Sequence, residues 1–322
     1  MPDAIQFGSG AVALASDDHS DIRSAGAHAG LMSAIKRDAL RLTSEPLAPG
    51  LYLVATPIGN LGDVTLRALA VLAQADVVYC EDTRHSAKLL QHFAIHAVTR
   101  PFHDHNEDAE RARVLAELAT GKRIALISDA GTPLISDPGF KLVRACRADS
   151  IPVFSIPGAS SIPAALSSSG LPTDAFFFAG FLPPKQAARR AKLDDLKTYS
   201  GTLIFFEAPQ RAAAALADMA DVLGPRDAVL SRELTKLHEE HLSAPLPELA
   251  KAVAEREIKG EVVILVAPAA PAEVTDNAIE QRLHAALGSM SLKDAAKTVA
   301  DALDVPKARA YALGLKIKDG GA

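Results

Sequence analysis

The stretch that decides the fold is RIALISDAGTPLISDPG, residues 123–139. Its first five residues form a run of strand type that is apolar after Arg123, and a loop with two Ser-Asp pairs, two glycines and two prolines follows directly. Aliphatic residues favour strands, whereas Gly and Pro end them. A buried strand that ends in a stiff loop is typical of the carboxyl edge of a parallel sheet, where α/β proteins bind ligands. The stretch therefore predicts an α/β fold with a ligand site at this loop.

The same alternation of strand and helix signals recurs on both sides of this stretch. It forms two series that meet around residues 165–173. Strands that alternate with helices predict βαβ units and a largely parallel sheet. Asp137 followed by Pro138 predicts the N-cap and first residue of the next helix. We therefore expect two α/β domains, at 49–168 and 169–269, with a ligand cleft between them.

The two ends of the chain depart from this pattern. Residues 1–48 lack sustained periodicity apart from a short helix expected at 31–42, so we predict a mobile extension. Residues 270–322 carry no strand signal and predict a helical appendage, with two of its helices split at 304–306. From Gly288 onward there are six Lys or Arg and four Asp or Glu. Helix-turn-helix units that contact nucleic acid have this balance, and so do plain solubilising caps.

The composition limits the class of protein. The chain has 322 residues, 48% hydrophobic and 23% charged, which excludes disordered and fibrous classes. No apolar run approaches the roughly 20 residues of a membrane-spanning helix, and the N-terminus lacks a secretory pattern. The two cysteines, Cys80 and Cys146, have no metal-ligand spacing and predict buried thiols in a reducing compartment. We expect a cytoplasmic protein without a metal site, whose net charge of −5 disfavours broad nonspecific binding of nucleic acid.

Three loops that contain Gly and Pro follow predicted strands, at 55–63, 128–139 and 155–161. Because parallel strands end at one edge, these loops should converge. None contains the phosphate-binding patterns GxxxxGK[ST] or GxGxxG. Their prolines remove amide donors and leave a stiff wall rich in carbonyls. Such a wall suits a ligand with amino groups, an adenine edge and a positive charge, and S-adenosylmethionine has all three.

Eight motifs in a fixed order carry a resemblance to a known family. They span about residues 50–268 and are LYLVATPIGNLGDVTLRAL, EDTRHSAKLL, HDHNE, SDAGTPLISDPG, SIPGASS, GFLPPK, FFEAPQR and KGEVVILV. The set resembles the ribosomal RNA small subunit methyltransferase I family of the tetrapyrrole methylase superfamily. The resemblance implies a homodimer of chains with two α/β domains and a cofactor cleft. It also implies methyl transfer from S-adenosylmethionine to the ribose 2'-oxygen of a decoding-site cytidine in 16S rRNA, within the 30S subunit.

The resemblance further implies which residues bind the cofactor. They come from the three loops and from two segments of the second half. The set is Pro57, Gly59, Asp129, Gly131, Thr132, Pro133, Ile135, Ser136, Ser160, Ser161, Glu207, Ala208, Pro209, Gly260, Glu261 and Val262. Among them, Pro57 and Gly59 are expected near the cofactor or the target.

Methyl transfer to a hydroxyl needs alignment and a proton acceptor. Two clusters offer one, EDTR at 81–84 and HDHNE at 103–107. The candidate catalytic residues are Glu81, Asp82, Arg84, His105 and Glu107. A carboxylate beside an Arg is often an ion pair with a lowered pKa, so a structural role for EDTR stays open. Histidine titrates near working pH, but HDHNE is equally consistent with a helix cap, and its spacing predicts no metal.

Basic residues of the second half are the expected RNA contacts. They are Lys185, Arg189, Arg190, Arg211, Arg232 and Lys236. A basic helix face is usually only solvated, and the resemblance favours RNA here. Two alternatives stay open: a methyltransferase of the same superfamily that acts on a small tetrapyrrole or a protein, and a noncatalytic ribosome-assembly factor.

Overall fold

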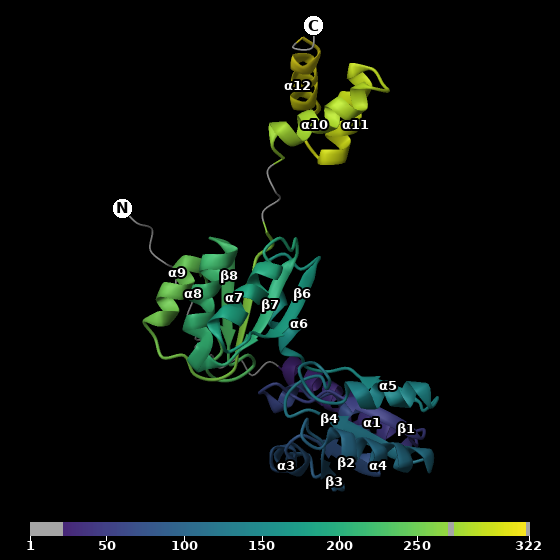
Figure 1. The fold of residues 1–322 in the computed structure, drawn as a ribbon. Coiled ribbons are helices and arrows are strands. Elements are labelled where there is room, and N and C mark those ends of the chain that lie inside the picture. The colour runs from purple at the N-terminus through teal and green to yellow at the C-terminus, as the bar shows by residue number, and fades with distance from the viewer. Residues whose placement is uncertain (1–21, 270–273, 320–322) are drawn as a thin grey trace. The chain divides into compact units, whose positions relative to one another are not determined.

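The computed structural model describes residues 22–269 and 274–319, and within these the side chains of residues 28–269 and 274–318. The chain forms two compact units, one that ends at Pro268 and one that begins at Ala269. The first unit contains two β-sheets with their helices (Figure 1).

The first sheet has five parallel strands in the order β3-β2-β4-β1-β5. Their bounds are β1 Gly50–Val54, β2 Val77–Cys80, β3 Thr99–Pro101, β4 Arg123–Ile127 and β5 Val153–Ile156. Five helical segments lie between or beside these strands: the 3-10 turn η1 Leu61–Asp63, and the helices α2 Leu66–Gln74, α3 Thr83–His92, α4 Glu107–Ala119 and α5 Phe140–Ala148. The prediction of a parallel α/β sheet is confirmed for this half.

Helices cover both faces of the first sheet, which explains the unbroken apolar run in β4. Ala125 and Ile127 pack with α2 and α3, whereas Ile124 and Leu126 pack with α4 and α5. A strand that is buried on both faces needs apolar residues at every position. Cys80 lies in the first of these cores and Cys146 in the second, both as buried free thiols, as predicted.

The second sheet has the order β6-β7-β10-β8-β9 and is mixed. Its strands are β6 Phe176–Phe181, β7 Thr202–Glu207, β8 Asp227–Arg232, β9 Glu240–Pro245 and β10 Val262–Val266. Only β6 and β7 are parallel, because β10 runs antiparallel to both β7 and β8, and β8 to β9. The expectation of a largely parallel sheet was therefore wrong for this half. The turn that joins β8 to β9 is short enough for an antiparallel hairpin, which alternation alone does not distinguish.

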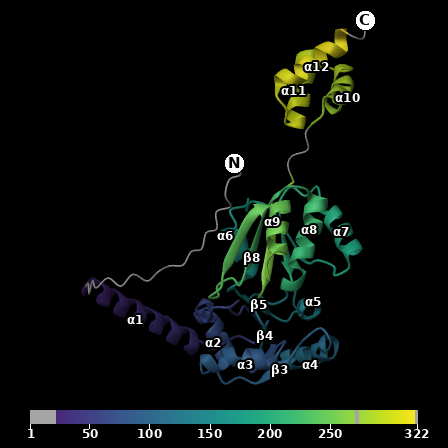
Figure 2. The same cartoon turned by 90° about the vertical axis from the view of Figure 1, so that its left-hand side faces the viewer.

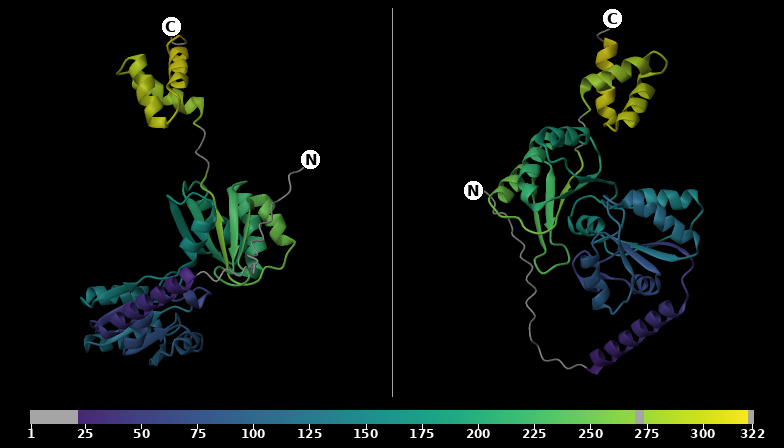
Figure 3. Two further views of the ribbon diagram at one scale, coloured as in Figure 1. Left: turned by 180° about the vertical axis from the view of Figure 1, so that it is seen from behind. Right: turned by 60° about the horizontal axis from the view of Figure 1, so that its bottom comes forward.

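Helices α7 Gln186–Asp195, α8 Ala212–Leu223 and α9 Leu246–Ala254 pack on one face of the second sheet, and the 3-10 turn η2 Pro209–Arg211 precedes α8. Helix α6 Ser161–Ser168 packs on the other face. Ile58 from the loop after β1 joins α6 in that core, against Ile204 and Val229 of the second sheet. The two halves therefore share one apolar core; Figure 1 labels α6 beside the second sheet, and Figure 3 shows both halves from two further sides.

Helix α1 spans Ile22–Ser44 and lies against α2 (Figure 2). Gln74 donates a hydrogen bond from Nε2 to the carbonyl of Leu42 at 3.2 Å. The mobility of the predicted extension over 1–48 stays a prediction: residues 22–44 of it form this helix, and residues 1–21 lie outside the described residues. The helix is longer than the 31–42 expected.

In the described part of the second unit, residues 274–319, the chain forms the helices α10 Asp276–Leu287, α11 Leu292–Leu303 and α12 Lys307–Asp319. Ile279, Leu283 and Val299 lie in its own apolar core. The predicted split between the last two helices is confirmed, because Asp304 ends α11 in a left-handed conformation with φ 50°. Among the helices that the structure describes, none is both long and apolar enough to span a bilayer.

Candidate functional site

The loops after β1, β4 and β5 meet at one edge of the first sheet, as predicted. Thr56 and Gly131 exchange two backbone hydrogen bonds of 2.9 and 3.1 Å. The Thr56 hydroxyl donates to the carbonyl of Ser128 at 3.1 Å, and the Thr132 hydroxyl donates to that of Ala159 at 3.3 Å. These contacts follow from the strand order, in which β1 lies between β4 and β5.

The loop of residues 128–139 is held in an unusual backbone conformation. Leu134 and Ser136 have φ values of 72° and 67°, which cost non-glycine residues about 1–2 kcal/mol each. At Gly139, φ is 123°, and an added Cβ would lie 2.9 Å from Cδ2 of Leu126. Only glycine fits there, and α5 begins after it at Phe140. The prediction that Asp137 caps this helix was wrong.

Asp137 instead lines the same cavity as Glu81, which follows the end of β2, and each of the two carboxyl groups affects the pKa of the other. The Asp129 carboxylate accepts the N–H of Asp82 at 3.2 Å. This hydrogen bond connects the ends of the neighbouring strands β2 and β4, and the carboxyl groups of Glu81, Asp129 and Asp137 all line one cavity.

The proximity of these carboxyl groups changes how they titrate. Burial, followed by the charges of Asp137 and Asp129, raises the pKa of Glu81 to about 7. Burial is also the largest cause that raises the pKa of Asp137 to about 6, and Asp129 and Asp104 add to the rise. Both groups therefore hold protons at a higher pH than ordinary carboxyls do.

The second half supplies the opposite wall of the site. The Glu207 side chain is fully buried, pairs with Arg211 at 2.8 Å and accepts the N–H of Ala208 at 2.8 Å. Gly260 has φ 84°, and an added Cβ would lie 2.2 Å from Oε1 of Glu233. Close packing of the wall therefore requires glycine at this position.

These walls enclose a cavity of about 400 Å³, here named the first cavity. Most of the predicted cofactor-binding residues line it: Asp129, Gly131, Thr132, Ile135, Ser136, Ser160, Ser161, Glu207, Ala208, Pro209, Gly260, Glu261 and Val262. Glu81, Asp137, Phe181 and Phe206 are further lining residues. The lining contains acidic side chains but no Lys, Arg or His. Pro133, which was also predicted, is not among the lining residues.

A second cavity of about 580 Å³ adjoins the first, and the two share Ile58, Asp129, Ala130 and Glu261. Pro57 and Gly59 line this second cavity and not the first. Exposed His85 and Lys88 from α3 also line it. A basic edge thus lies next to the acidic first cavity.

Loops from the two halves meet at these cavities. The N–H of Asn60 donates to Oγ1 of Thr235 at 3.1 Å, and Lys236 lies over Gly59. Lys236 pairs with Glu233 at 3.0 Å and with Glu261 at 3.3 Å. These ion pairs neutralise the second-half carboxylates near the cavities.

Of the five predicted catalytic residues, the structure brings only Glu81 to a cavity wall. Asp82 caps α3 and pairs with Arg84 at 2.8 Å, and hydrogen bonds from Arg84 lower the pKa of Asp82 to about 2. His105 is exposed, and Glu107 is buried near Lys141 at 3.8 Å. Neither lines a cavity. Within residues 22–269 and 274–319, no three His, Cys, Asp or Glu side chains are arranged to hold a metal ion.

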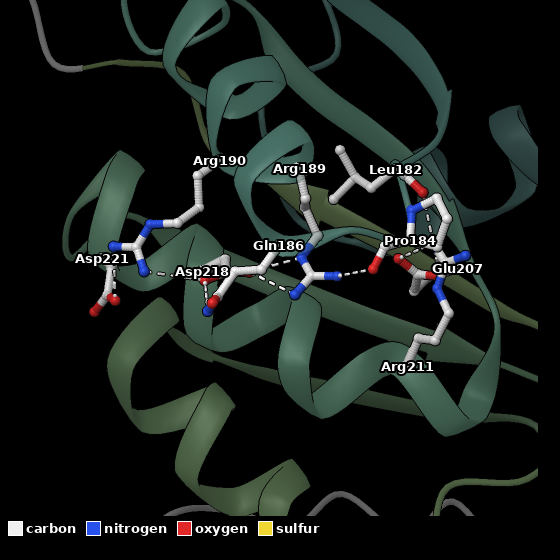
Figure 4. A network of polar contacts seen from close by, with 9 residues as sticks. All are labelled: Leu182, Pro184, Gln186, Arg189, Arg190, Glu207, Arg211, Asp218 and Asp221. Atoms are coloured by element: carbon white, nitrogen blue, oxygen red, sulfur yellow. Dashed lines mark hydrogen bonds and ion pairs between the residues drawn. The ribbon is translucent and has the colours of Figure 1, made fainter.

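Most of the predicted RNA contacts are engaged within the chain (Figure 4). Arg189 is buried and pairs with Asp218 at 2.6 Å, so its prediction as an RNA contact was wrong. Arg190 pairs with Asp218 and Asp221 at 3.2 and 3.0 Å.

The remaining RNA candidates differ in exposure. Arg211 pairs with Glu207, as described above, and Arg232 pairs with Glu240 at 3.3 Å. Lys185 is exposed at the N-terminus of α7 and stays a prediction.

Asp137 is the residue that sequence reasoning missed. The local pattern Asp-Pro favours a helix cap, and this interpretation accounted for Asp137 without any role in the ligand site. The repeat of Ser-Asp at 128–129 and 136–137 was the available signal, since it places two carboxylates in one strand-end loop.

Comparisons with known proteins agree with this geometry. The family described as Tetrapyrrole (Corrin/Porphyrin) Methylases matches residues 50–250, and the RsmI C-terminal HTH domain matches residues 273–318. Two relatives are named ribosomal RNA small subunit methyltransferase I. The Vibrio cholerae protein is 47% identical over 275 residues, which cover 84% of this chain and 95% of that protein. The Mesorhizobium japonicum protein is 46% identical over 280 residues, which cover 86% and 95%.

Solved structures show the same fold at low identity. The cobalt precorrin-4 methyltransferase CbiF matches with a TM-score of 0.53 and 18% identity, over 67% of this chain and 94% of that one. A diphthine synthase matches with a TM-score of 0.51 and 17% identity, over 67% and 89%. From the family matches and the close relatives together, the chain belongs to the tetrapyrrole methylase family and, within it, to the ribosomal RNA small subunit methyltransferase I proteins.

Proposed function

We propose that this chain transfers a methyl group from S-adenosylmethionine to the ribose 2'-oxygen of a cytidine at the decoding site of 16S rRNA. The observation that carries the proposal is the first cavity, a site lined by carboxylates and without a basic side chain. The names of the close relatives support rRNA as the acceptor. The choice of the 2'-oxygen and of cytidine rests on the eight-motif resemblance.

The residues of the first cavity fit a cationic methyl donor. Its volume of about 400 Å³ lies within the roughly 300–1,000 Å³ typical of small-ligand sites. Glu81, Asp129 and Asp137 place negative charge on one wall, and opposite charges attract strongly where water is scarce. A neutral or anionic ligand would gain nothing from this wall.

The two ends of the donor would meet different walls. Phe206 and the backbone of Glu207 to Pro209 would hold the flat adenine, because aromatic faces and carbonyl groups suit an amino-substituted ring. The loop Gly131–Ser136 would hold the ribose and the amino acid part. When bound, the donor supplies an electrophilic methyl group on a positively charged sulfur. The strained loop keeps its polar groups aligned, which is the main requirement of such a transfer.

The second cavity would take the acceptor nucleotide. It adjoins the first cavity at Asp129 and Ala130, so an acceptor placed there is next to the donor. His85 and Lys88 would contact the phosphates of the RNA backbone, since protein cations supply most of the affinity for nucleic acids. Lys185 and the helix-turn-helix unit would add contacts to a folded particle.

We extend the proposal to the state of the protein in the cell. The acceptor would be the 30S subunit in the cytoplasm, and the enzyme would act as a homodimer. Exposed Phe176, Phe177 and Phe181 on the edge strand β6 support a second copy, because large apolar side chains are seldom left in water. Light scattering of the purified chain tests the dimer.

The reaction is tested with labelled S-adenosylmethionine and 30S subunits from a strain that lacks this protein. We expect label in a 2'-O-methylated cytidine of 16S rRNA after nuclease digestion. Label in another nucleoside would contradict the position, and transfer to naked 16S rRNA at the same rate would contradict the need for the particle. An absence of transfer, with donor binding retained in calorimetry, would favour a small tetrapyrrole, a protein acceptor or a noncatalytic role.

A further inference from the structure

The acceptor hydroxyl must lose a proton during methyl transfer, and the structure offers one place for it. Glu81 and Asp137 lie on the wall of the first cavity together with Asp129. Neighbouring carboxyl groups that are withdrawn from water resist full ionisation, because like charges repel and burial disfavours the charged form. The placement of the pair therefore favours a bound proton beside the donor site.

We propose that Glu81 and Asp137 act as one carboxyl pair, which releases its shared proton when the cationic donor binds and accepts the proton of the acceptor hydroxyl during transfer. This inference rests on the proposed function and adds Asp137 to it. Glu81 and Asp137 are the catalytic residues of the proposal, and the neighbouring carboxylates of Asp129 and Asp104 raise the pKa values of the pair.

The charges of the cavity explain why the pair suits this task. The charged groups that act on it are negative: Asp129 from the loop after β4 and Asp104 from the segment before α4. The second-half carboxylates of the same cavity are already paired, Glu207 with Arg211 and Glu261 with Lys236. The first-half pair is therefore the part of the wall that responds to an incoming positive charge.

The charge balance of the reaction follows. Before transfer, the sulfonium carries +1 and the ionised pair carries −2. The hydroxyl oxygen forms its bond to the methyl carbon, the carbon–sulfur bond breaks with its electrons left on sulfur, and the hydroxyl proton moves to the pair. Afterwards the sulfur is a neutral thioether and the pair carries −1, so the cavity keeps the same net charge. Conserving charge avoids an unpaired ion in a site with little water. The proton leaves to water after the product departs.

The surrounding structure supports the pair as a unit. The hydrogen bond from the N–H of Asp82 to Asp129 holds the residue after Glu81 against the end of β4, and the left-handed conformation of Ser136 directs the following residue, Asp137. The burial of both groups, with the negative neighbours, raises their pKa values toward neutral pH. A general base works best when its pKa is close to the working pH.

Titration calorimetry in buffers of different ionisation enthalpy measures protons released on binding, without any acceptor. For the wild-type chain near pH 6.5 we expect proton release with S-adenosylmethionine and much less with S-adenosylhomocysteine, which lacks the sulfonium charge. At pH values below the pKa of the pair, the affinity for S-adenosylmethionine should increase by up to about tenfold for each unit by which the pH is raised. In the variants Asp137→Asn and Glu81→Gln, the difference in proton release between S-adenosylmethionine and S-adenosylhomocysteine should disappear.

The same variants are then assayed for methyl transfer to 30S subunits. Loss of a general base should lower the rate by about 10²–10⁴-fold and remove the fall in rate at acid pH. Asp149→Asn, an exposed carboxyl at the end of α5, is the matched control and should behave as wild type. Retained affinity for S-adenosylhomocysteine shows that each variant keeps its fold.

Equal proton release with both ligands would overturn the proposal, and so would an Asp137→Asn variant with the wild-type rate and pH profile. The two proposals fail separately. Proton release with no methylation of 30S subunits would refute the acceptor and support the pair. Methylation without differential release would support the acceptor and refute the pair.

Discussion

Asp218→Ala is expected to destabilise the first unit by about 3–5 kcal/mol. The Asp218 side chain is 2% exposed and accepts hydrogen bonds from Arg189 at 2.7 Å, Gln186 at 3.0 Å and Arg190 at 3.2 Å (Figure 4). Alanine removes all of these acceptors at once. The Arg189 side chain, 6% exposed, would be left in the core without its counter-ion, and an unpaired buried charge is among the most destabilising changes known.

The same network predicts a smaller effect at its edge. The Arg190 side chain is 42% exposed, and pairs with such access to water contribute about 0–1 kcal/mol. Arg190→Ala also leaves Asp218 paired with Arg189. We therefore expect Asp218→Ala to be several-fold more destabilising than Arg190→Ala, because only the first change leaves a buried charge without its counter-ion.

Urea denaturation of the full chain, followed by circular dichroism, measures both effects. Lys185→Ala is the matched control, because Lys185 is exposed next to the same helix, and it should stay within about 0.5 kcal/mol of wild type. A stability of Asp218→Ala within that margin would refute the reasoning. An Arg189→Ala variant with wild-type stability but weakened binding to 30S subunits would restore Arg189 as an RNA contact.

Three further predictions test the site. Gly260→Ala should weaken binding of S-adenosylmethionine at least tenfold in calorimetry, because the added Cβ would collide with Glu233. Gly224→Ala is the control, because Gly224 has a similar φ of 79° and no atom lies within 4 Å of an added Cβ. Lys88→Ala should raise KM for 30S subunits and leave affinity for S-adenosylhomocysteine unchanged, and an unchanged KM would exclude Lys88 from the acceptor site. Because the pKa of Glu81 is raised to about 7 in the folded chain, the folded state binds a proton that the unfolded chain releases, so this group's contribution to stability should fall as pH rises from about 4.5 to about 7. Glu81→Gln should flatten that part of the profile in denaturation experiments, and a profile identical to wild type would contradict the raised pKa.

The strands were predictable because their signals are local. Residues 124–127 are apolar throughout, since helices cover both faces of the sheet, and residues 128–139 combine the Gly and Pro that end a strand. Three such loops after parallel strands had to converge, and the exchange between Thr56 and Gly131 confirms it. The motif resemblance then located most of the first-cavity lining.

Other features depended on partners far away in the sequence. The strand signals of the second half do not show whether neighbouring strands run parallel or antiparallel, so only the structure reveals that this sheet is mixed. Arg189 has the sequence surroundings of a solvated helix face, yet it pairs with Asp218, which follows 29 residues later. A run of charged residues in the sequence shows the helical period. It does not show which face of the helix another helix covers.

Local sequence alone thus determined the strands, the order of the loops and the edge at which they meet. The tertiary structure decided which carboxyl groups work together. Asp137 has the local pattern of a helix cap, and only the placement of β2 beside β4 brings it to Glu81. The physical reason is that charge interactions depend on distance and burial, which are properties of the packed chain, whereas turn and strand preferences act between neighbouring residues.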